Sequence, residues 1–224
     1  MERIGGDVVG MGDVDTLPLP AERRRGSHRR GWYMVIAAAL GLAIVSWVTN
    51  ITTEAQLAGQ ADGFLGVRST FSKLANSGTA WAGLGIACGW LVRRPLPAAA
   101  AGIVGSLLSL VAHYVFGRLS GMFTANIWAE NLEWFVAAII FGGPLGLIGA
   151  LARRPGAWGL AARLVVPLGA VLEPFVVGMF ALHPMMSAPQ HLSSMATAIT
   201  LIIGGVAMGA AVLVDATKPR REFH

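Results

Sequence analysis

Residues Leu132 to Leu151 read LEWFVAAIIFGGPLGLIGAL, a run of 20 in which Glu133 is the one charged residue. At about 1.5 Å per residue, a helix of this length reaches ~30 Å, the thickness of the hydrocarbon core of a bilayer. Pro144 lies inside the run, and packed neighbours satisfy the carbonyl that proline leaves unpaired in a membrane helix. The run therefore predicts a membrane-spanning helix.

Further apolar runs lie on both sides of this one. Together they predict an all-α fold, a polytopic membrane helical bundle with six transmembrane helices. The composition agrees, because 54% of the chain is hydrophobic, its mean hydropathy is +0.61 and 13% is charged, whereas a soluble domain has about a quarter of its residues charged. A very apolar soluble bundle is the alternative, and it is disfavoured by runs this long. The other runs cover residues 32–48, 79–92, 98–116, 164–182 and 195–214.

Lysines and arginines collect beside alternate turns of this arrangement. With six spans and a cytoplasmic N-terminus, 14 of the 17 basic residues fall on the cytoplasmic side, and Arg68, Lys73 and Arg118 fall outside. Because cytoplasmic loops carry an excess of basic residues, we expect both ends of the chain in the cytoplasm. The cytoplasmic set is Arg3, Arg23, Arg24, Arg25, Arg29, Arg30, Arg93, Arg94, Arg153, Arg154, Arg163, Lys218, Arg220 and Arg221.

The expected organisation has three parts. Residues 1–30 are too polar to form a core and are expected to be a disordered, basic cytoplasmic tail. Residues 31–215 form the six-helix transmembrane domain, and residues 216–224 form a short basic cytoplasmic tail. The abundance of arginine, alanine and glycine is typical of GC-rich bacterial genomes, so we expect a multi-pass protein of the bacterial plasma membrane.

The net charge of +5 is explained by arginines that flank apolar runs, where they meet lipid headgroups. The sequence has no basic face with interleaved aromatic residues, so nucleic-acid binding is not expected. It also has no phosphate-binding, hydrolase or zinc-protease motif. We therefore expect neither an enzyme nor a cofactor. Cys88 is the single cysteine, and His183 and His191 have no cysteine or acidic neighbour, so no metal site is expected either.

Glu173, His113 and Glu133 form the candidate intramembrane polar site. An ionisable group inside an apolar helix costs about 2.5–3.5 kcal/mol and needs a reason. Glu173 lies mid-run before Pro174 and is either a proton or cation site or a neutral acid bonded to another helix. His113 is either a titrating group or part of an interfacial aromatic anchor with Tyr114. Glu133, with Glu130 on the same face, either attracts a cation or complements a helix dipole.

We expect the bundle to be surrounded by lipid. We also consider that small-residue helix faces bind a membrane-protein partner or a second copy of the chain. Small residues four apart allow close helix contact, and serve either a homodimer seam or packing within one bundle. These pairs are Ala39 with Ala43, Gly85 with Gly89, Gly142 with Gly146, and Gly205 with Gly209. The loops 50–75 and 117–131 mix aromatic and polar residues and are expected to be interfacial segments, such as short amphipathic helices that lie on the membrane or cap a cavity.

Two segments share a layout. Each has an asparagine, a tryptophan, an apolar helix and an Arg-Arg-Pro turn, at Arg93-Arg94-Pro95 and at Arg153-Arg154-Pro155. His113 and Glu173 both lie twenty residues after the first arginine. A duplicated helical hairpin is one interpretation, and ordinary cytoplasmic turns are the other.

The stretch Leu74-Ala-Asn-Ser-Gly-Thr-Ala-Trp81, with the glycine-rich helix that follows and Gly142-Gly-Pro-Leu-Gly146, resembles a family of actinobacterial multi-pass membrane proteins known as a domain of unknown function. The resemblance covers roughly residues 36–215. It implies a membrane-embedded helical bundle and no particular activity. A looser architectural similarity is to the six-helix substrate-binding subunits of vitamin-importing energy-coupling transporters, which dock a partner through small residues like Ala39 and Ala43.

Two functions stay open at this point. The first is a small transporter or transport subunit with a polar intramembrane site around Glu173. The second is a non-transporting structural, sensory or partner-binding membrane protein whose polar groups hold helices together.

Overall fold

The computed structural model describes residues 20–51, 62–181 and 187–218. Residues 1–19 of the expected tail, and most of the expected C-terminal tail, lie outside the described residues. The first helix already begins at Pro20, within the expected N-terminal tail. His183 also lies outside the described ranges.

Every regular element in the described part of the chain is a helix, as expected for an all-α protein. Five helices are long and apolar enough to cross a membrane, and a sixth apolar helix is shorter. Leu132–Leu151 forms one helix with the bounds read from its sequence. The elements are α1 (Pro20–Asn50), α3 (Asp62–Ala75), α4 (Gly78–Val92), α5 (Pro95–Leu119), α6 (Ile127–Glu130), α7 (Leu132–Leu151), α8 (Ala157–Val176) and α9 (Ala188–Thr217).

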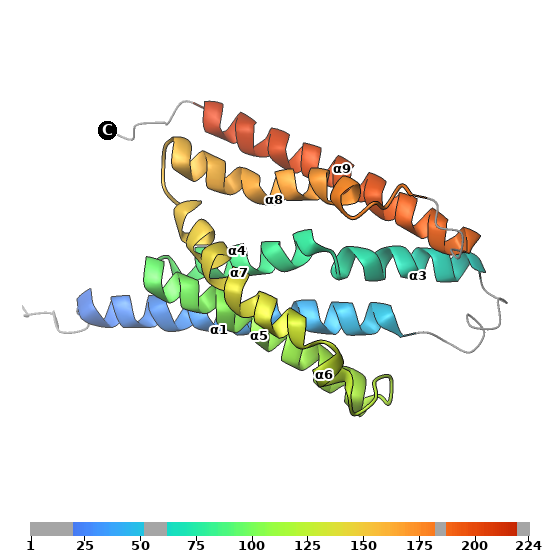
Figure 1. The fold of residues 1–224 in the computed structure, drawn as a ribbon. Helices are drawn as coiled ribbons and strands as arrows, with labels where there is room; N and C mark the ends of the chain where they lie inside the picture. The colour runs from blue at the N-terminus through green and yellow to red at the C-terminus, as the bar shows by residue number, and fades with distance from the viewer. Residues whose placement is uncertain (1–19, 52–61, 182–186, 219–224) are drawn as a thin grey trace, which may run out of the picture.

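The long helices alternate in direction along the chain (Figure 1). As a result, the start of α1, the α4–α5 turn, the α7–α8 turn and the end of α9 all lie at one end of the bundle. We call this the basic end, because its described residues include Arg29, Arg93, Arg94, Arg153 and Arg154. Arg68, Lys73 and Arg118 lie on helices near the opposite end.

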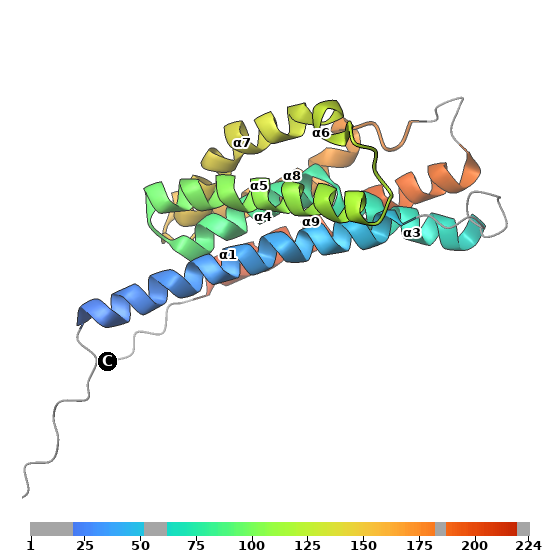
Figure 2. The ribbon, with the colours of Figure 1, turned by 90° about the horizontal axis from the view of Figure 1, so that it is seen from below.

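Helix α5 lies between α1 and α7 (Figure 2), and α4 packs against both α5 and α7. Glycine makes these contacts possible. A Cβ built on Gly89 would lie 1.9 Å from the backbone oxygen of Gly146, and one on Gly102 would lie 2.1 Å from that of Gly142. These glycines therefore serve packing within one bundle, which is one of the two interpretations of the small-residue pairs.

Ala39 and Ala43 are likewise fully buried inside the bundle, each with 0% of its surface exposed. Val35, one turn before Ala39, belongs to the same buried cluster as Leu84 and Cys88 of α4. This face of α1 is therefore covered by the chain's own helices. For Ala39 and Ala43 this burial agrees with packing within one bundle, one of the two interpretations of the small-residue pairs.

Part of the loop 50–75 forms a helix, α3, which contacts other helices of the bundle. This helix continues the direction of α4 (Figure 1) and packs between α1 and α9. Its polar side chains explain this position: Arg68 Nη1 donates to the backbone oxygen of Thr49, 2.8 Å away, and Ser72 donates to the amide oxygen of Asn50. Helices α3 and α4 thus form one long rod with a break at residues 76–77.

Helices α8 and α9 pack along each other, and α9 also packs on α3, whereas α8 contacts α4 and α7 over a small area. Gly156, in the turn between α7 and α8, has a positive φ of 87°, a conformation that glycine adopts without strain. The two hairpins with a shared layout therefore differ in packing, because α4 and α5 pack closely whereas α7 and α8 diverge. This difference gives no support to a duplicated hairpin.

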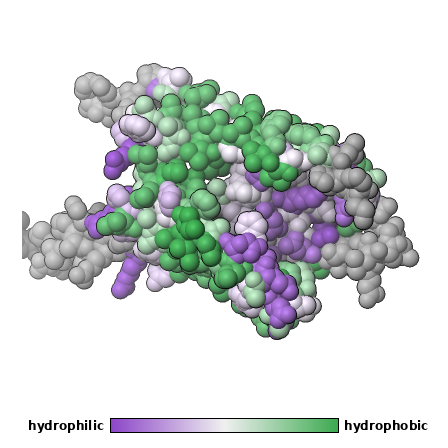
Figure 3. Space-filling view, viewed as in Figure 1, coloured by the Kyte–Doolittle hydropathy of each residue, from purple (hydrophilic) through white to green (hydrophobic). Residues whose placement is uncertain are grey.

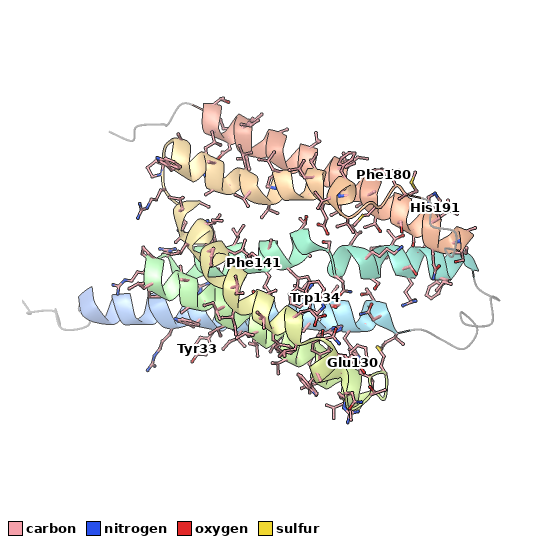
Figure 4. The ribbon with its side chains drawn as sticks, viewed as in Figure 1. Tyr33, Glu130, Trp134, Phe141, Phe180 and His191 are labelled. Carbon is pink, nitrogen blue, oxygen red and sulfur yellow. The ribbon has the colours of Figure 1, made fainter. Side chains whose placement is uncertain are left out.

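Large apolar side chains cover the outside of the long helices, among them Phe141 at 61% and Ile203 at 64% exposed. Figure 4 shows Trp134 and Phe141 along α7, with Glu130 near the end of the bundle opposite the basic end. A soluble monomer rarely exposes so much contiguous apolar surface. Lipid contact accounts for it.

Candidate functional site

The break between α3 and α4 is built from residues that favour helix ends. Asn76 donates from both its backbone nitrogen and its side-chain amide to the backbone oxygen of Ser72, at 2.9 and 2.8 Å. The Ser77 hydroxyl donates to the backbone oxygen of Leu74 (2.8 Å) and accepts from the backbone nitrogen of Ala80 (3.1 Å). Serine is a preferred N-cap residue for this reason. Side chains of the break thus satisfy backbone groups of both helices.

Glu173 completes the break from the neighbouring helix α8. One carboxylate oxygen accepts from the backbone nitrogen of Gly78 at 2.7 Å. The other accepts from the backbone nitrogen and the hydroxyl of Thr79, at 2.8 and 2.5 Å. Each oxygen of the Glu173 side chain thus accepts from a backbone N–H group of α4, an arrangement that a carboxylate can adopt. Pro174, next in the chain, is fully buried.

The start of α4 is a favourable place for this negative charge. The first N–H groups of a helix lack partners inside it, and the helix dipole adds about half a positive charge there. Gly78 and Thr79 are the first residues of α4, so Glu173 meets two of these unpaired N–H groups. Hydrogen bonds from backbone N–H groups stabilise a carboxylate in surroundings that would otherwise penalise its charge. Glu173 therefore joins α8 to α4 as a cap supplied from another helix.

His113 reaches the same break through Ser46 of α1. The Ser46 hydroxyl donates to the amide oxygen of Asn76 at 2.6 Å, and His113 Nδ1 lies 3.0 Å from the Ser46 oxygen. A hydroxyl has one hydrogen, so Nδ1 of His113 is the donor to Ser46. The His113 side chain is 7% exposed and its ring contacts Tyr114 and Phe123, with centroids 5.4 and 5.5 Å away. It is part of a buried aromatic cluster rather than an interfacial anchor.

Glu133 is not brought to the break by a contact. It lies exposed in the first turn of α7. Acidic residues at this position complement the helix dipole, which is one of the two interpretations proposed from the sequence. Glu130 is also exposed, on α6. Of the three candidate residues, Glu173 contacts the break directly and His113 contacts it through Ser46.

Sequence reasoning missed Ser46, Ser77, Thr79 and Lys73 as site residues. Lys73, at the end of α3, donates to the backbone oxygen of Gln190 (3.1 Å) and to the hydroxyls of Ser193 and Ser194 (both 2.7 Å) on α9. The run Asn76-Ser-Gly-Thr79 has the residue types that cap helices, and this was the available signal. No local signal marks Ser46.

Hydrophilic residues gather on one face of the molecule, over α3 near its junction with α4, between α8–α9 and the α6–α7 segment (Figure 3). Asn76 and Gly78 are exposed, and Lys73, Thr79 and Glu173 are half-buried. We call these five residues the polar face. It lies nearer the end of the bundle opposite the basic end, since Glu173 is close to the end of α8 at Val176.

Among the described residues, no group of three or more histidine, cysteine, aspartate or glutamate side chains is placed to hold a metal ion. The chain matches no family model, no curated protein and no solved structure. The arrangement of the break, with a carboxylate held at the start of a half-helix, therefore carries the functional argument.

Proposed function

We propose that the chain crosses the bacterial plasma membrane six times with both ends in the cytoplasm. The alternating helix directions and the arginines at one end of the bundle support this orientation. In this topology α3 and α4 together make the second crossing. Helix α4 has 15 residues, or about 22 Å, which is short of the ~30 Å hydrocarbon core. The last turns of α3 complete the distance.

We propose further that the protein is a small transporter or transport subunit that itself moves protons across the membrane, along a path that passes Glu173. The observation that carries this proposal is the break in the second crossing, with Glu173 bound to the start of α4. Transporters place half-helix ends near the middle of the membrane to hold charged groups. Here the break lies about 22 Å from the basic end, in the part of the membrane facing away from the cytoplasm.

The packing supplies a mechanism. Helices α8 and α9 hold each other firmly but contact α4 and α7 little, so Glu173 is a main polar link between α8 and α4. A proton on Glu173 replaces an acceptor with a donor, and the three donors on Gly78 and Thr79 lose part of their bonding. Helix α8 is then free to move away from α4 and widen the polar face. The proton is exchanged with water while the link is open.

A structural role is the second candidate, and one observation favours it. The first three N–H groups of α4 are all paired, those of Gly78 and Thr79 with Glu173 and that of Ala80 with Ser77. A fully paired network needs no ligand and rigidifies the place where helices meet. In this case Glu173 holds α8 to α4 permanently.

Proton flux into liposomes separates the two candidates. The full chain is reconstituted with a pH-sensitive dye inside, and valinomycin with a potassium gradient sets the membrane potential. If the protein is a transporter, we expect a proton flux above that of protein-free liposomes for the wild type and no such flux for Glu173→Gln. The control Glu130→Gln, which changes an exposed carboxylate on α6, is expected to conduct as the wild type does. If the wild type gives only the leak of empty liposomes, or if Glu173→Gln conducts as the wild type does, the transport proposal is rejected.

A further inference from the structure

The two arginine turns at the basic end are held side by side by the packing of α4 on α7. A Cβ built on Gly149 would lie 2.0 Å from the backbone oxygen of Ile86 and 2.7 Å from the backbone nitrogen of Trp90. Arg153 Nη1 donates to the backbone oxygen of Trp90 at 3.2 Å, and its guanidinium lies 4.3 Å from the centre of the Trp90 ring. This contact fixes the α7–α8 turn against the end of α4.

Each of the two turns carries two exposed arginines, Arg93 and Arg94 in one and Arg153 and Arg154 in the other. We call them the arginine cluster. Burial, and then the positive charge of Arg93, lower the pKa of Arg153, as expected for like charges on two turns that the contact between Arg153 and Trp90 holds together. Among the described side chains, the one ion pair joins Lys218 to Asp215. No described carboxylate therefore neutralises the cluster.

Arg93 occupies a backbone conformation that suits glycine. It caps the end of α4 with a φ of 74°, and it is the one non-glycine residue with positive φ in the described part of the chain. A side chain in this region strains the backbone. Glycine is the usual residue at such a helix end. The strained position thus carries a long basic side chain for which the described residues offer no acidic partner.

Exposed large apolar side chains lie close to the arginines of the cluster in the sequence. Trp90 is 46%, Leu96 84% and Trp158 78% exposed, and each is within a few residues of a cluster arginine in the sequence. Tryptophan is enriched where the hydrocarbon of a membrane meets its headgroups. An anion that binds here therefore meets cationic groups on one side and apolar surface on the other.

We propose that the arginine cluster is a binding site for the phosphate group of an anionic phospholipid, whose acyl chains lie against the apolar side chains beside it. The guanidinium groups offer paired N–H donors that match phosphate oxygens. Exposed Leu96 and Trp158 favour a lipid over free phosphate, because a free ion gains nothing from apolar surface. The site does not depend on transport, and it exists whether or not Glu173 moves protons.

Thermal melting of the purified full chain in neutral detergent tests the site. Phosphatidylglycerol, phosphatidylcholine and inorganic phosphate are titrated separately against the wild type, Arg93→Gly and Arg153→Gln. The control is Arg29→Gln, which removes one exposed arginine of the basic end outside the cluster. Of the three additives, we expect only phosphatidylglycerol to raise the melting temperature of the wild type and the control. Each cluster variant is expected to need about five-fold more of it, the scale set by one arginine near an anionic surface.

Arg93→Gly allows a second, independent test, because the glycine relieves the backbone strain at this position. Without lipid this variant is expected to melt at a higher temperature than the wild type, while it responds less to phosphatidylglycerol. A general loss of folding cannot produce both changes. The site is rejected if Arg93→Gly responds to phosphatidylglycerol as the wild type does, or if Arg29→Gln weakens the response equally. Equal stabilisation by inorganic phosphate would assign the cluster to a free anion instead of a lipid.

Discussion

Replacing Glu173 by alanine tests the central contact of the structure. The change removes the acceptor of two backbone N–H groups and one hydroxyl at the start of α4. A donor left without a partner in buried surroundings costs about 1–3 kcal/mol, and a charge at a helix N-terminus contributes roughly 0.3–1 kcal/mol more. Gly78 is exposed, so water replaces part of its bond. The expected loss is about 2–4 kcal/mol.

For a chain of this size, 1 kcal/mol shifts the melting temperature by roughly 2–4 °C, so Glu173→Ala is expected to lower it by roughly 4–16 °C. Cys88 provides the assay, because it is the single cysteine and is 0% exposed. A dye that fluoresces on reaction with thiols, added to the full chain in detergent, reports the temperature at which Cys88 becomes accessible.

Thr79→Val is the matched control for this experiment. It keeps the shape of the side chain and both backbone bonds to Glu173, and it removes one hydroxyl bond, for an expected loss of about 1 kcal/mol. Because the two residues are in contact, their combined effect is expected to be smaller than the sum of the single effects. If Glu173→Ala melts within 1 °C of the wild type, or no lower than Thr79→Val, the assignment of Glu173 as the cap of α4 is wrong.

Two further changes test the packing around the break. Gly89→Ala places a methyl group 1.9 Å from the backbone oxygen of Gly146, so α4 and α7 must separate; overpacking of this kind costs about 1–3 kcal/mol. Gly41→Ala, with nothing within 4 Å of the added carbon, is expected to melt at or slightly above the wild-type temperature, and equal melting of both variants would contradict the packing. Lys73→Met keeps the apolar stem but removes three hydrogen bonds to α9, and we expect a loss of about 2 kcal/mol in the same thiol assay. An unchanged melting temperature would mean that this lysine does not join α3 to α9.

Hydropathy located most of the long helices, but it placed α8 too late: the expected run covers residues 164–182, whereas the helix spans Ala157–Val176, so Glu173 lies near the end of α8 and not in its middle. The bounds of α7 agree with the run from Leu132 to Leu151, and α4 begins at Gly78, one residue from the start of its run. Apolar length is a local property, and the membrane rewards it locally, so single stretches suffice to predict such helices. The same reasoning could not tell that α3 packs inside the bundle, because Arg68 and Lys73 make its sequence resemble a polar loop. Both residues donate hydrogen bonds to other helices, Arg68 to α1 and Lys73 to α9.

The candidate site, like the helices, could be predicted from the sequence only in part. Glu173 stood out in the sequence because a charge in an apolar helix is costly. Its partners Gly78 and Thr79 are 95 and 94 residues away, and no local pattern connects them. Ser46, which links His113 to Asn76, is one serine in an apolar run and carries no mark of its role.

The amino-acid sequence was enough to predict the all-helical class, the approximate positions of the apolar helices and the residue whose charge requires compensation. Each of these follows from the affinity of a short segment for lipid or water. The folded molecule was needed to see that α3 and α4 form a broken rod, that Ala39 and Ala43 face inward, and that Glu173 caps α4. Helix packing inside lipid depends on the close fit of backbones and on a few polar contacts, and such contacts join residues that are distant in the chain.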